Sequence, residues 1–82
     1  MLLMKTDLFS PQNRKLLALA TLENERKSLQ SEGYRFIGQC NLLGVISYAF
    51  RHPANKNRML LRLRGTTIEI MKNRELIKTI KL

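Results

Sequence analysis

The chain has 82 residues, 44% of them hydrophobic, and a formal net charge of +9 at pH 7. A chain of this length buries one modest core, which excludes a second large domain or a deep substrate cleft. Its hydrophobic content is ordinary for a globular protein, so the charge does not indicate disorder. We expect one domain over residues 1–82, with an N-terminal extension (1–9), a helical part (10–33) and an antiparallel sheet (34–82).

The N-terminal third of the sequence predicts one long helix. Ser10 followed by Pro11 is a helix-start signal, because the serine hydroxyl can cap a free backbone N–H and proline needs no donor at the first helical position. Gly33 is typical of the left-handed residue that ends a helix. We therefore predict a helix over residues 11–32. Its predicted buried stripe consists of Leu16, Leu19, Leu22 and Leu29, with Ala20 beside them and Arg26 interrupting it.

After Gly33 the composition changes to alternating, β-branched and aromatic residues, which favour strands. Turn residues such as Gly, Asn and Pro separate the alternating runs. The predicted strands are Tyr34–Gln39, Gly44–Arg51, Arg58–Arg64, Thr67–Met71 and Leu76–Leu82. We expect the aromatic residues Tyr34, Phe36, Tyr48 and Phe50 in the core, because the leucine stripe of the helix needs an apolar sheet face to cover.

The order of these elements predicts an α+β fold in which one long N-terminal helix packs on an antiparallel meander of four to five strands. The same elements are compatible with a strongly bent sheet or a small open barrel, a layout similar to that of Sm-like and SH3-like modules.

The single cysteine, Cys40, excludes an internal disulfide and a zinc site built from several thiolates. We expect Cys40 to be a buried small hydrophobic residue in a protein of a reducing, cytoplasmic compartment. The apolar runs are far shorter than the ~20 residues that a membrane span needs, so we expect no membrane partner.

The positive charge is concentrated in the C-terminal part of the sequence. Ten of the 15 Lys and Arg residues follow Gly33, where only Glu69 and Glu75 oppose them. Such an asymmetry predicts a polyanionic partner.

The stretch from Arg51 to Arg64 has several positive charges and no acid. Strand alternation places Arg58, Arg62 and Arg64 on one sheet surface, and the arginine side chain suits phosphate oxygens. The loop before them carries side chains that can reach a groove or a base edge. The predicted nucleic-acid contacts are Arg51, His52, Asn55, Lys56, Asn57, Arg58, Arg62 and Arg64, with secondary basic contacts at Lys72, Arg74 and Lys78.

The residues that catalysis requires are scarce. The sequence holds one histidine and one cysteine, and no nucleophile motif, metal-binding pair or phosphate-binding glycine loop is present. His52 is the one candidate acid or base, and a histidine before proline in a polar loop is usually a turn residue. We expect no enzyme, no catalytic residue, no metal site and no cofactor.

The sequence leaves two candidate functions. The preferred hypothesis is a small, non-enzymatic module that binds DNA or RNA through the phosphate backbone, with low sequence specificity. The alternative is a regulatory or inhibitor-like interaction module that docks on an acidic protein partner or forms a weak homodimer instead of remaining a monomer. Its motivation is the last strand, where Leu76, Ile77, Ile80 and Leu82 lie on a predicted sheet edge.

Overall fold

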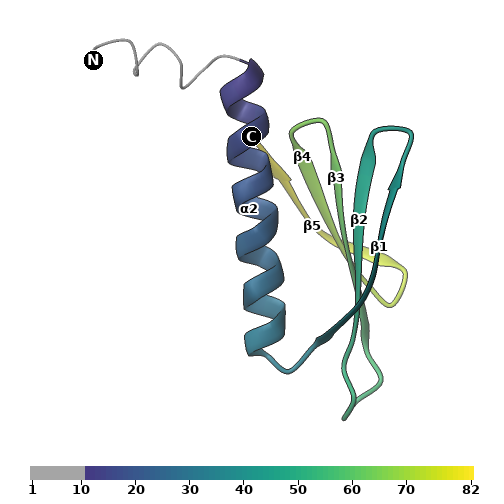
Figure 1. Cartoon of the computed structure of the whole chain (residues 1–82). Coiled ribbons are helices and arrows are strands. Elements are labelled where there is room, and N and C mark those ends of the chain that lie inside the picture. The colour runs from purple at the N-terminus through teal and green to yellow at the C-terminus, as the bar shows by residue number, and fades with distance from the viewer. Residues whose placement is uncertain (1–10) are drawn as a thin grey trace.

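The computed structural model describes residues 11–82 as one helix packed on one sheet (Figure 1). The strands pair in their chain order, and every neighbouring pair is antiparallel. The predicted helix on an antiparallel meander is confirmed. The elements are α2 (Pro11–Ser31), β1 (Arg35–Leu42), β2 (Val45–Arg51), β3 (Arg58–Arg64), β4 (Thr67–Lys72) and β5 (Glu75–Lys81).

The five-stranded sheet stays open, with β1 and β5 at its two edges. The alternative of a strongly bent sheet or a small open barrel is therefore wrong. The predicted N-terminal extension and the Ser10 cap lie outside the described residues. Within residues 11–82, no helix combines the length and the apolar content that crossing a membrane requires.

The C-terminal end of α2 is fixed by a Schellman motif around Gly33. The Tyr34 N–H donates to the carbonyl of Leu29 at 3.0 Å, and the Gly33 N–H donates to the carbonyl of Gln30 at 3.1 Å. Gly33 has a φ of 99°, which lies in the left-handed region that glycine adopts without strain. Tyr34 and Leu29 are both buried, so the motif also has its usual apolar contact. The predicted glycine cap is confirmed.

The face of α2 that meets the sheet differs from the predicted leucine stripe. Ala18, Leu22 and Leu29 are buried, whereas Leu16 and Leu19 are 58% and 37% exposed. At about 100° per residue, Leu16 lies nearly opposite Ala18 around the helix axis, so both cannot face the sheet. The small Ala18 side chain, fully buried, lets the helix approach the strands closely.

Arg26, which interrupts the predicted leucine stripe, lies on the sheet side of α2. Its guanidinium carbon is 4.7 Å from the ring centroid of Phe36 and 5.8 Å from that of Tyr48. Its Nη1 also donates to Glu23 of the same helix at 3.4 Å. The aromatic faces thus accommodate a cation at the helix–sheet interface, on the side of α2 that the leucine stripe was predicted to fill.

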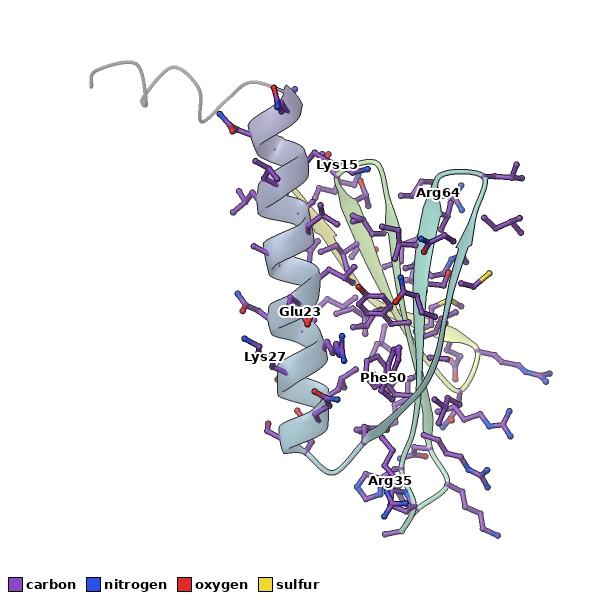
Figure 2. All side chains as sticks on the ribbon, in the orientation of Figure 1. Lys15, Glu23, Lys27, Arg35, Phe50 and Arg64 are labelled. Carbon is purple, nitrogen blue, oxygen red and sulfur yellow. The ribbon has the colours of Figure 1, made fainter. Side chains whose placement is uncertain are left out.

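The core lies between α2 and the sheet face formed mainly by β2, β3 and β4. Figure 2 shows Phe50 pointing from the sheet toward the helix, and its side chain is fully buried. The prediction that the aromatic residues belong to the core is confirmed, because Tyr34 and Phe50 are buried while Phe36 and Tyr48 pack against them. The other buried hydrophobic residues of the sheet are Met59, Leu61, Leu63, Ile68 and Ile70.

A β-bulge in β1 reverses the side-chain alternation of that strand. The register with β2 shifts between Phe36 and Gly38, so one extra residue, Ile37, is inserted. Cys40 consequently pairs with Ser47 on the face away from α2 and is exposed. The expectation that Cys40 is buried is therefore wrong.

Candidate nucleic-acid interface

The sheet face turned away from α2, here called the open face, carries the arginines of β3. Met59, Leu61 and Leu63 are buried beneath α2, and Arg58, Arg62 and Arg64 alternate with them along the strand. The predicted alternation is therefore present.

Three arginines lie side by side at one end of the open face. Arg35 of β1 pairs with Arg51 of β2, and Arg51 pairs with Arg58 of β3. All three residues are exposed. We call this set the arginine row. Like charges directly opposite each other on neighbouring strands destabilise a sheet, so this arrangement opposes folding. Arg35 was not among the predicted contacts, because its position beside Arg51 depends on the strand register.

Lys56 and Arg74 extend the arginine row into the adjoining loops. Lys56 lines a surface hollow together with Arg35 and Arg51, and Arg74 lines a neighbouring hollow together with Arg58. We call these five residues the basic end. Lys56 and Arg74 have φ values of 60° and 73°, a left-handed conformation that disfavours side chains of this size.

The charges of the basic end are unopposed. Two ion pairs occur among residues 11–82, one within α2 and one between β3 and β4, and neither includes a residue of the basic end. Figure 2 shows long side chains with nitrogen at their tips fanning out from the lower end of the sheet, near the labelled Arg35. The arrangement can attract an extended anion.

The other two arginines of β3 do not continue this cluster. Arg62 pairs with Glu69 across the sheet, and its Nε lies 3.9 Å from a carboxylate oxygen of Glu69. Its Nη1 is also 3.9 Å from the sulfur of Met71. Arg64 lies at the opposite end of the sheet, as its label in Figure 2 shows. Glu69 thus interrupts the cationic surface that the alternation of β3 predicted.

His52 joins the loop between β2 and β3 to the end of α2. Its Nε2 lies 3.1 Å from the carbonyl oxygen of Glu32, and its Nδ1 accepts the N–H of Ala54 at 3.1 Å. The tautomer with its proton on Nε2 satisfies both contacts, because Nε2 then donates to Glu32 while Nδ1 accepts from Ala54. The ring also packs edge to face on Tyr34, with centroids 5.0 Å apart. Because both nitrogens have partners, His52 here holds the loop in place and offers no free nitrogen to a ligand.

The asparagines predicted as base contacts instead organise the loop. Asn55 Oδ1 accepts the N–H of Asn57 at 2.9 Å, and Asn57 Oδ1 accepts Nδ2 of Asn73 at 3.1 Å. Asn73 Oδ1 in turn accepts the N–H of Arg58 at 2.8 Å. This network fixes the backbone at the start of β3, and it therefore stabilises the position of the basic end.

The secondary contacts divide between the two faces. Arg74 belongs to the basic end, as described above. Lys72 pairs with Met59, and Lys78 pairs with Ile70, so both lysines belong to the sheet face that α2 covers in part. Both are exposed. A ligand on the open face therefore does not meet Lys72 and Lys78 together with the arginine row.

Among the residues that the structure describes, no three His, Cys, Asp or Glu side chains gather in a way that could hold a metal ion. Comparison with protein-family models, with curated proteins and with solved structures finds no match for this chain.

Proposed function

We propose that this chain is a small, non-enzymatic module that binds nucleic acid through its phosphate backbone, with the basic end as the main contact surface. The observation that carries the proposal is the set of five unopposed cations gathered from β1, β2, β3 and two loops. Its contacts are charges and not base edges, so low sequence specificity follows. The proposed setting is the cytoplasm.

Folding stability argues against a purely structural role for these cations. Three of them lie directly opposite one another, and the other two occupy backbone positions that favour glycine or asparagine. The folded protein would be more stable with neutral side chains in the row and glycine in the loops. Residues that lower stability in this way are typical of functional sites, and an anionic ligand would offset the repulsion.

A salt titration of binding tests the proposal. If the five cations each neutralise one phosphate, the plot of log K against log salt should have a slope of about −4.5 on duplex and about −3.5 on a single strand. No binding at about 50 mM salt, or a flat salt response, would refute the proposal.

Two matched triple variants locate the surface. Changing the arginine row to glutamine should weaken binding and reduce the duplex slope by about 2.7. The control removes the same charge elsewhere, by changing Lys15, Lys27 and Lys81 to glutamine; all three are exposed and none belongs to the basic end. An equal loss of slope in both variants would show that binding depends on total charge and not on the basic end.

A second candidate function is pairing of β5 with another chain, either a second copy or a protein partner with an acidic face. β5 is an edge strand, and Leu76 and Ile77 are 54% and 55% exposed. Light scattering at several concentrations tests the homodimer. A strict monomer that binds nucleic acid would remove support for this candidate, which the lysines of β5 and its bulged pairing with β4 also disfavour.

A further inference from the structure

Next to the arginine row, the open face carries a row of apolar side chains. Ala49 of β2 pairs with Leu60 of β3, and Leu60 pairs with Met71 of β4. The bulge of β1 adds Ile37, which is 58% exposed. We call Ile37, Ala49, Leu60 and Met71 the apolar row. Along each strand the two rows are two residues apart, which corresponds to about 6.8 Å.

A hollow of about 300 Å³ extends from the apolar row to Arg58 of the arginine row. The apolar row, Arg58 and Arg74 line it, together with Phe50, Met59 and Asn73. Its volume lies at the lower end of the range for small-molecule sites. A ligand that fills the hollow needs a flat or apolar part, and a ligand that binds the basic end needs negative charge.

On the basis of the proposed function, we infer that the basic end and the apolar row together take nucleic acid with unpaired bases, one base entering the hollow while its phosphates contact the arginine row. A nucleotide carries an apolar ring system and an anionic phosphate on one short frame. In a duplex the bases are stacked inside and the protein meets mainly phosphates and groove edges. Only a single strand, a loop or an end offers both parts to a sheet surface.

The base contacts differ from those of aromatic stacking platforms. Phe36, Tyr48 and Phe50 lie on the helix side of the sheet, and Phe50, although it lines the hollow, is fully buried, so these rings do not offer an exposed face for stacking at the open face. The hollow offers aliphatic side chains, the thioether of Met71 and the planar guanidinium groups of Arg58 and Arg74. Such contacts discriminate weakly among the four bases.

Fluorescence anisotropy with the full chain and three probes at equal salt tests the inference. The probes are a single strand of about 12 nucleotides, an abasic strand of equal length, and the corresponding duplex. The single strand should bind about three- to tenfold tighter than the abasic strand, a smaller gain than aromatic stacking gives. It should also bind tighter than the duplex, although charge density alone favours the duplex.

Two double variants assign the effect to the hollow. Leu60→Thr with Met71→Thr should abolish the preference for the single strand over the abasic strand. Leu42→Thr with Val45→Thr, at the far end of the sheet, should preserve it. Thermal unfolding checks that each variant is folded, and if the first is not, the comparison of probes on the unchanged chain decides.

The outcomes separate the inference from the function on which it rests. Equal binding of single and abasic strands, or tighter binding of the duplex, would overturn the inference and leave backbone binding standing. Binding of none of the probes would refute both. Binding of an acidic amphipathic peptide without any nucleic acid would likewise refute both and assign the surface to a protein partner.

Discussion

Removing a charge from the arginine row should raise the stability of the protein and weaken its binding of nucleic acid. Arg51, at the centre of the row, is the best residue for testing both effects. Arg51 faces Arg35 on one side and Arg58 on the other. The change Arg51→Gln keeps most of the side-chain stem and removes two like-charge pairs at once. With about 0.2–0.5 kcal/mol for each exposed pair, the free energy of unfolding should rise by about 0.4–1 kcal/mol at low salt. The midpoint of thermal unfolding should rise by about 2–8 °C.

The measurement is urea denaturation at low salt and again at about 1 M salt, since urea is uncharged and does not screen the pairs itself. The matched control is Arg64→Gln. Arg64 faces Val45 and Thr67, so its removal lowers the net charge equally without relieving a like-charge pair. At about 1 M salt the Debye length is about 3 Å, and the gain for Arg51→Gln should disappear.

The binding assay completes the test. Arg51→Gln should weaken nucleic-acid binding and reduce the salt slope by about 0.9 on duplex, while Arg64→Gln should change it little. If Arg51→Gln is no more stable than Arg64→Gln at low salt, or if its gain persists at high salt, then repulsion within the row is not what opposes folding. The arginine row would then give no stability-based support for a binding function.

Three further changes probe the surroundings of the basic end. Glu69→Gln frees Arg62 from its ion pair, so nucleic acid should bind more tightly and the salt slope should steepen by up to about 0.9; unchanged titrations would show that Arg62 does not reach the ligand. Arg74→Gly places glycine at a φ of 73° and should raise the free energy of unfolding by about 0.5–1 kcal/mol while weakening binding, as denaturation and anisotropy would measure. Gly33→Ala should lower that free energy by about 1–3 kcal/mol, because a Cβ there would lie 2.7 Å from His52 Nε2 and the residue has a φ of 99°. In a His52→Ala background, Gly33→Ala should be less destabilising. If the effects of the two substitutions on the free energy of unfolding were strictly additive, the contact between the new Cβ and His52 would be contradicted.

The parts of the fold that depend on local chemistry could be predicted from the sequence. Gly33 ends α2 because a left-handed residue is needed where it stands. The alternation of Arg58 to Arg64 places three arginines on one face whatever surrounds the strand. These predictions required no knowledge of neighbouring strands.

Features that depend on a partner element could not be predicted in the same way. Arg35 joins the basic end through its register with Arg51, and Arg62 meets Glu69 only because β3 and β4 pair as they do. One extra residue in β1 moves Cys40 to the opposite face. Arg26 contacts two aromatic rings on the sheet side of α2, and hydrophobic periodicity alone does not indicate this contact.

The consecutive strand order also has a consequence for how the chain folds. Every strand pairs with its neighbour in the sequence, and the connections at Leu43–Gly44, Gly65–Thr66 and Asn73–Arg74 are two-residue turns. Hairpins of this kind close within about 1–10 μs, and a topology with mostly local contacts favours rapid folding. The meander can therefore grow hairpin by hairpin, and we expect the docking of α2 on β3 to be the slow step that completes the native state.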